Sequence, residues 1–199
     1  AGQLAFLTVS QHSLSELIQS GGLTSNFDGI FSQLDLGLLD ESSAKELIAV
    51  PMGRCGVALQ PAVRDELLAY CGPHPFYLQM LGFYGCDLLA NGVFSTAQVI
   101  DEFSAEAERH WRGLWHALSS EEQAVFCSVD QPATTPEFQV HCRALVRKGV
   151  LLVVDNRYRP FSAGFARWAH SQEAQPAGHP AAPEPEEAMI EEKSAEPAP

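Results

Sequence analysis

The segment VLLVVDNRYRPF at residues 150–161 constrains the fold more than any other part of the chain. Two short runs suited to β-strands are separated only by Asp155 and Asn156. Asp and Asn tolerate the positive φ that a two-residue hairpin turn requires. The segment therefore predicts a β-hairpin.

Helices are predicted on both sides of this hairpin. Ser119, with Glu122 three residues later, forms a capping box at the start of SSEEQAVFCSV. TPEFQVHCRALVRKG follows, with apolar residues at the spacing of one helix face. SAGFARWAH is predicted to close the unit as a helix. Helix, helix and hairpin is the order of a winged helix, which we place at residues 95–170 together with an aromatic helix at 96–118.

The first part of the chain predicts alternating strands and helices. LAFLTVS at residues 4–10 is a near-continuous apolar run, as in a buried strand, and a helix should start at Ser13. A second strand is expected at residues 29–37. These β-α elements make up a first unit at residues 1–38.

A helical unit is expected at residues 39–94. Its first helix is capped by Asp40 and stopped by Pro51, and its second covers residues 61–71. A third, apolar helix runs to about Ala90. The chain is therefore predicted to be mainly α, within the α+β class.

The stretch YCGPHPFYLQM places Gly72, Pro73 and Pro75 at the start of this third helix. Proline is tolerated in a first helical turn, because the amide hydrogen it lacks would be unpaired there. A helix start is also a common place for a phosphate or another anion. Two interpretations stay open: a plain corner that begins a helix with His74 exposed, or a binding site.

Charge and composition divide the chain into three parts. Residues 1–108 carry 13 acidic and 3 basic side chains, a net charge of −10, and residues 109–170 carry 5 acidic and 8 basic, a net charge of +3. Residues 171–199 carry 7 acidic side chains and one lysine, a net charge of −6. This last part is rich in Ala, Pro and Glu and predicts a disordered tail or linker.

The five cysteines, at positions 55, 71, 86, 127 and 142, are scattered and lack metal-knuckle spacing. We expect reduced core thiols and a reducing compartment. No run approaches the roughly 18 apolar residues that span a bilayer. We therefore expect a soluble cytoplasmic protein with no membrane partner, and a piece of a longer one.

Three segments, in order, resemble the C-terminal half of the signal-transduction ATPases with numerous domains, which are AAA-like P-loop switches. LAFLTVSQHSL is similar to their sensor strand and the helix after it. FDGIFSQLDLGLLDESSAKELI is similar to their last core strand and first lid helix, and CGPHPFYLQML to their lid motif. The resemblance implies remnant elements of an ATPase core at residues 1–38, a helical lid and a winged helix.

The resemblance also implies four contacts to ATP or ADP. Ser10 would sense the terminal phosphate, Pro75 would pack on adenine, and Gly72 and His74 would face the nucleotide. Pro73 departs from the family, which has a second glycine there. The phosphate loop, GxxxxGK followed by Ser or Thr, occurs nowhere in the chain, and neither does the magnesium strand. Nucleotide with magnesium is therefore expected only together with an N-terminal P-loop half, which would be the main partner. Oligomerisation would belong to the parent protein.

Two other functions stay open. The expected recognition helix and wing carry basic residues suited to DNA phosphates: Arg143, Arg147, Lys148, Arg157 and Arg159. A net charge of +3 is modest for a nucleic-acid binder. The chain could instead be a silent scaffold that docks a partner protein through its lid face.

Catalysis and metal binding by this chain alone are not expected. LLVVDN reads like a magnesium-binding strand, but the hairpin accounts for Asp155 without a metal. His110 and His116 are six residues apart on one helix and face different directions. The aromatic cluster of Trp111, Trp115, Phe126 and Phe138 is expected to be core.

Overall fold

A computed structural model describes residues 36–130 and 135–173, together with six single positions before residue 36. These ranges are mainly helical, as predicted, with one two-stranded sheet. Apart from those single positions, the strand predicted at residues 4–10, the helix predicted from Ser13 and most of the strand at 29–37 lie outside the described residues. The tail predicted at 171–199 begins too early, because its first three residues continue α8 to Glu173, and the rest of it lies outside the described residues.

Seven helices and two strands follow one another within the described ranges. They are α2 (Glu41–Arg54), α3 (Pro61–Cys71), α4 (Pro75–Ala90), α5 (Thr96–His116), α6 (Ser120–Cys127), α7 (Pro136–Arg147), β1 (Leu151–Val154), β2 (Arg157–Pro160) and α8 (Ala163–Glu173). No helix among them is both long and apolar enough to cross a membrane.

Several local predictions are confirmed. The Asp40 side chain caps α2 by accepting a 2.9 Å hydrogen bond from the Ser43 amide. Ser119 and Glu122 form the predicted capping box of α6. Asp155 and Asn156 have φ angles of 50° and 59°, and Val154 pairs with Arg157 across the turn. The two-residue hairpin therefore forms where the sequence placed it.

The prediction that Pro51 stops the first lid helix is wrong. The helix continues through Pro51 to Arg54, and the Cys55 amide donates to the Pro51 carbonyl oxygen at 3.1 Å. Met52, in this extra turn, is fully buried beside Gly85 of α4. We infer that the burial of this side chain offsets the hydrogen bond that proline removes.

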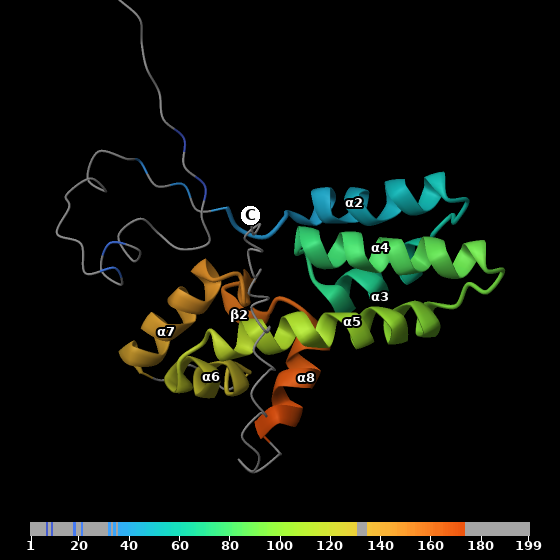
Figure 1. Ribbon diagram of the computed structural model, residues 1–199. Helices are drawn as coiled ribbons and strands as arrows, with labels where there is room; N and C mark the ends of the chain where they lie inside the picture. The colour runs from blue at the N-terminus through green and yellow to red at the C-terminus, as the bar shows by residue number, and fades with distance from the viewer. Residues whose placement is uncertain are drawn as a thin grey trace, which may run out of the picture.

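The helices form two groups that share α5 (Figure 1). α2, α3, α4 and the first part of α5 pack into a helical bundle. α6, α7, β1, β2 and α8 form a second group, here called the hairpin unit, in which α7 packs on α6 and β1. α8 packs on α3 and α5, so the two groups share one continuous core.

Aromatic rings fill the junction between the two groups. Trp111 and Trp115 of α5 and Phe126 of α6 are buried, as predicted, whereas Phe138 is only half-buried. Phe165 of α8 is fully buried, with its ring centroid 5.2 Å from that of Phe126. The bundle and the hairpin unit are therefore held together by stacked and edge-on rings.

The prediction of reduced cysteines is wrong for one pair. Cys55, just after α2, and Cys86 of α4 form a disulfide, with their Cα atoms 5.7 Å apart. Cys71 and Cys142 are buried thiols, as expected. The pair was missed because its members meet only after α2 extends past Pro51 and packs on α4.

Breaking this disulfide is expected to lower the free energy of unfolding by about 3 kcal/mol, because it closes a loop of 31 residues in the unfolded chain. Urea denaturation with and without reductant measures the change. The double variant Cys55→Ser/Cys86→Ser should have the same free energy of unfolding as the reduced protein, and reductant should not change it. Equal stability of oxidised and reduced wild type would contradict the prediction.

Candidate functional site

The segment before α2 lies against the corner between α3 and α4. The Leu39 amide donates a 3.0 Å hydrogen bond to the Pro73 carbonyl oxygen. A Cβ on Gly149, which follows α7, would lie 3.7 Å from Leu38 Cδ2. Residues 38 and 39 therefore contact both the hairpin unit and the bundle, and in Figure 1 their segment runs above the hairpin unit to the start of α2. The segment before α2 and the stretch at residues 72–75 therefore meet here.

Gly72 is buried and has a φ angle of +77°. A Cβ at this position would overlap the Phe161 carbonyl oxygen and lie 2.8 Å from Phe161 Cδ2. Glycine is required by both the backbone conformation and the close approach of Phe161. Packing alone thus accounts for this glycine, without a nucleotide.

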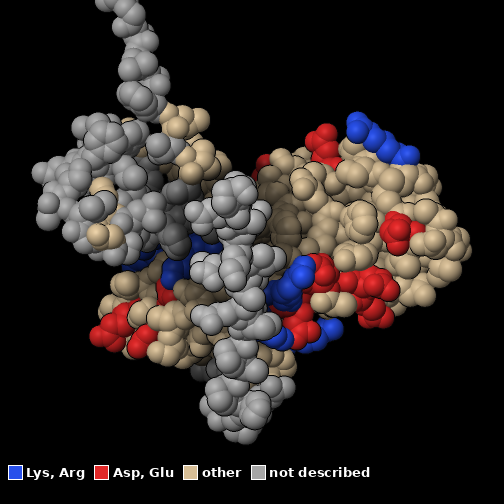
Figure 2. Space-filling model, viewed as in Figure 1, with Lys and Arg blue, Asp and Glu red and all other residues tan. Residues whose placement is uncertain are grey.

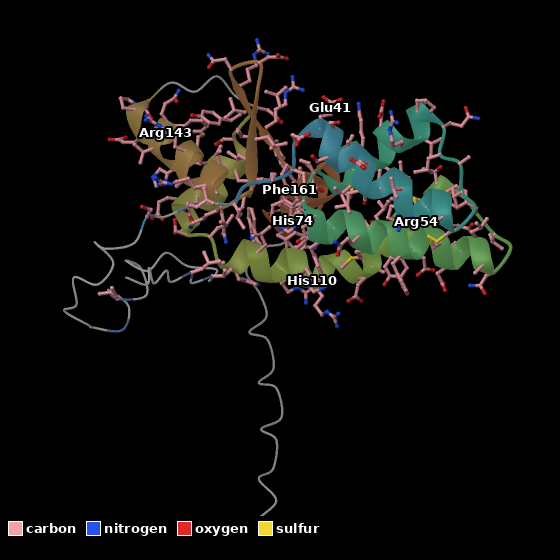
Figure 3. The ribbon with its side chains drawn as sticks, turned by 90° about the horizontal axis from the view of Figure 1, so that it is seen from above. Glu41, Arg54, His74, His110, Arg143 and Phe161 are labelled. Atoms are coloured by element: carbon pink, nitrogen blue, oxygen red, sulfur yellow. A yellow bond between two sulfur atoms is a disulfide. The ribbon has the colours of Figure 1, made fainter. Side chains whose placement is uncertain are left out.

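His74 is half-buried and caps α4. The plain-corner interpretation is therefore wrong only in leaving His74 exposed, and both interpretations of the corner stay open. Its Nδ1 accepts a 3.2 Å hydrogen bond from the Phe76 amide, which leaves Nε2 to carry the proton. Its ring centroid lies 5.0 Å from that of Tyr77 and 6.3 Å from that of Phe161 (Figure 3). Burial lowers the pKa of His74, so the imidazole is neutral near pH 7.

Pro75 begins α4 at its first position, as predicted. It has no amide hydrogen, and His74 already binds that of Phe76. Two of the four amides at this helix start are therefore unavailable to an anion. The corner is better suited to an uncharged ring than to a phosphate.

An apolar side chain lies exposed next to this corner. Phe76, the second residue of α4, is 42% exposed. The Phe76 ring lies 4.7 Å from that of His110 on α5. Neither of two surface hollows on the described chain, one beside the Cys55–Cys86 disulfide and one beside β2, is lined by Gly72, His74 or Pro75. Ser10, the fourth implied contact, lies outside the described residues.

The basic residues lie in the hairpin unit, apart from the corner. Arg143 and Arg147 of α7 and Arg157 and Arg159 of β2 are exposed. Figure 3 places Arg143 well away from His74 and Phe161. Lys148 donates hydrogen bonds of 2.7 Å to both carboxylate oxygens of Glu122, so it is engaged within the unit.

This ion pair predicts an acid-sensitive contribution to stability. Burial alone would raise the pKa of Glu122, but hydrogen bonds from Lys148 and the Ser119 amide hold it below its ordinary value of 4.5. A carboxyl with a lowered pKa stabilises the fold above its ordinary pKa and loses this effect as the pH falls through the lowered value. Wild type should lose about 1 kcal/mol more than Glu122→Gln between pH 6 and pH 3.

Urea denaturation at several pH values measures this difference, with the exposed Glu137→Gln as control. The free energy of unfolding of Glu137→Gln should change with pH as that of wild type does. Parallel pH profiles for wild type and Glu122→Gln would show that the ion pair does not contribute.

Groups of three or more His, Cys, Asp or Glu side chains that could hold a metal do not occur among the described residues. Asp155 lies in the hairpin turn, with the backbone conformation that the turn requires. The described part of the chain thus offers no built metal centre.

The chain matches no family model, and no curated protein or solved structure is significantly similar to it. The expected resemblance to the signal-transduction ATPases therefore rests on the three sequence segments alone. Sequence reasoning missed Leu39 and Phe161 as neighbours of the corner. No local signal could have found Phe161, because it contacts Gly72 from 89 positions further along the chain.

Proposed function

We propose that this chain is the nucleotide-responsive regulatory part of a signal-transducing ATP-binding protein, with a helical lid and a winged helix, and that it is not catalytic alone. The observation that carries the proposal is the hydrogen bond between Leu39 and Pro73. It joins the two segments that, in the family, exit the ATPase core and face the nucleotide. Residues 72–75 would then form one wall of the adenosine site, and a P-loop half would supply the other.

The chemistry of the corner fits adenine better than phosphate. Pro75 and the exposed Phe76 offer apolar surface on which a base can pack. The neutral imidazole of His74 keeps Nε2 as a donor, which suits a ring nitrogen that accepts. The chain has no phosphate loop, so binding of the phosphates and of magnesium belongs to the partner half.

Packing between the corner and Phe161 supports a regulatory role. Phe161 follows β2 directly and touches Gly72, and its ring stacks on Tyr77 of α4 with centroids 5.8 Å apart. The order α6, α7, β1, β2 and α8 supports the proposed winged helix. A nucleotide that shifts residues 72–75 would therefore press on the hairpin unit, and a change in the hairpin unit would alter nucleotide affinity.

Nucleotide binding by the protein that includes an upstream P-loop segment tests this proposal. Pro75→Ala should weaken ATP or ADP binding by about tenfold, which corresponds to the loss of one ring contact. Pro61→Ala is the matched control, because Pro61 begins α3 as Pro75 begins α4. Fluorescent nucleotide titration gives both affinities. Equal affinities for the two variants, or no nucleotide binding at all, would contradict the proposal.

A winged-helix DNA-binding regulator is the second candidate. The exposed arginines of α7 and β2 favour it, since both elements could follow a DNA backbone. Acidic side chains lie over the part formed by α2 to α5, which would keep DNA on the hairpin unit (Figure 2). Duplex binding that weakens with salt, and falls in Arg143→Ala and Arg147→Ala but not in Arg112→Ala, would support this function.

If the protein binds neither nucleotide nor DNA, the scaffold hypothesis remains. Its best surface is the outer face of α4, where Phe83 is 65% exposed beside the Cys55–Cys86 disulfide. A partner protein would then dock on this lid face, and Phe83→Ala should abolish capture of that partner.

A further inference from the structure

A surface hollow of about 840 Å³ lies beside the hairpin, away from the corner at residues 72–75. β2, the start of α7, the start of α8 and the residues after α6 form its walls. Its lining combines apolar groups, hydrogen-bonding groups and two cationic side chains. The lining residues include Val129, Phe138, Gln139, Arg157, Tyr158 and Arg159. Neither the nucleotide proposal nor the ATPase resemblance assigns it a role.

The two arginines make the hollow attractive to carboxylates. Arg157 and Arg159 are two apart on β2, so their side chains leave the same face of the strand. Their partners on β1 are Val154 and Leu152, which carry no charge. In the part of the chain that the structure describes, no carboxylate lies within 4 Å of either guanidinium. Asp130 is the only acidic residue among the described residues that line the hollow.

We propose that this hollow binds the acidic segment EPEEAMIEE, at residues 184–192 of the same chain. The segment carries five glutamates around Met189 and Ile190. Its carboxylates would pair with Arg157 and Arg159, and its two apolar side chains would pack on surfaces such as Phe138 and Val129. An extended peptide can lie in a surface hollow of this size.

The length of the chain makes this contact reachable. α8 lines the hollow with Ala163 and Ala166 and ends at Glu173, about 10 to 15 Å further along its axis. The ten residues at 174–183 can span up to about 33 Å when extended, so residues 184–192 can return to the hollow. Attachment to the same chain supplies an effective concentration in the millimolar range, which compensates for weak exposed ion pairs.

The consequence is an internal competitor for the basic face of the hairpin. While residues 184–192 occupy the hollow, Arg157 and Arg159 are neutralised and closed to other polyanions. Because exposed ion pairs are screened by salt, the tail should leave the hollow as ionic strength rises. A partner with a higher charge density, such as a nucleic acid, would have to displace it.

Cleavage of the full chain by a glutamate-specific protease tests the proposal. At low salt the double variant Arg157→Ala/Arg159→Ala should be cut within residues 184–192 about threefold faster than wild type, because a docked segment is protected. Mass spectrometry of the early products identifies the sites. Arg109→Ala/Arg112→Ala, which removes two exposed arginines from α5, is the matched control and should be cut like wild type. Circular dichroism confirms that both variants are folded.

Two results would overturn the inference. One is an equal cleavage rate in wild type and the β2 variant, which would mean that the segment does not occupy the hollow. The other is equal acceleration in the β2 and α5 variants, which would point to net charge rather than to a site. At about 1 M salt the difference between wild type and the β2 variant should vanish, and a difference that persists would contradict the electrostatic basis.

Discussion

Gly72→Ala is expected to lower the free energy of unfolding by about 3 kcal/mol. A non-glycine residue at φ 77° and ψ 169° costs about 1 kcal/mol or more, because this backbone region is essentially restricted to glycine. The new Cβ would also overlap the Phe161 carbonyl oxygen and crowd its ring, and moving that backbone adds about 2 kcal/mol. Urea denaturation of the folded chain measures the sum.

Gly92→Ala is a control for the cost of a positive φ angle without a steric overlap. Gly92 has a φ angle of +75°, but a Cβ there would meet no atom within 4 Å. Its alanine variant should therefore show only the conformational cost, about 1 kcal/mol. If the two variants lost equal stability, the close approach of Phe161 to Gly72 would be refuted.

Phe165→Ala is expected to have the largest effect, about 4 kcal/mol. The side chain is fully buried, and five other aromatic rings have centroids 5.2 to 6.3 Å from its own: Trp111, Trp115, Phe126, Phe161 and Trp168. Removing it leaves a cavity between the bundle and the hairpin unit that rigid rings cannot close. Thermal and urea denaturation both report the loss.

Phe83→Ala is the control for this change of side chain. Phe83 is 65% exposed, so its removal should cost well under 1 kcal/mol. A small effect at Phe165 would mean that the two groups do not share the core around this ring. If the near-ultraviolet circular dichroism signal is lost in Phe165→Ala but kept in Phe83→Ala, the packing of the surrounding tryptophans depends on Phe165.

Features fixed by residues close in sequence were predictable. The turn at Asp155, the capping box of Ser119 and the start of α4 at Pro75 each depend on a few neighbours, and each is confirmed. The end of α2 was not predictable, because it depends on the burial of Met52 against α4. Burial of one side chain outweighed the local preference of Pro51.

The corner at residues 72–75 shows the same limit. The sequence identified its members because they are consecutive, and it identified Pro75 as a helix start. It did not reveal that Phe161 packs on Gly72 or that Leu39 bonds to Pro73. Nor did it reveal that Glu122 engages Lys148, one of the basic residues considered for DNA binding. These contacts join distant segments, which only the fold brings together.

The length of α5 has a mechanical consequence. This single helix of 21 residues, about 30 Å long, packs on α4 in the bundle and carries Trp111 and Trp115 into the aromatic junction. A helix without a break acts as a lever, so a tilt of about 10° at one end displaces the other by about 5 Å. A tilt of α5 near Val99 would therefore reach Trp115 as a larger displacement, with no intermediate loop to absorb it.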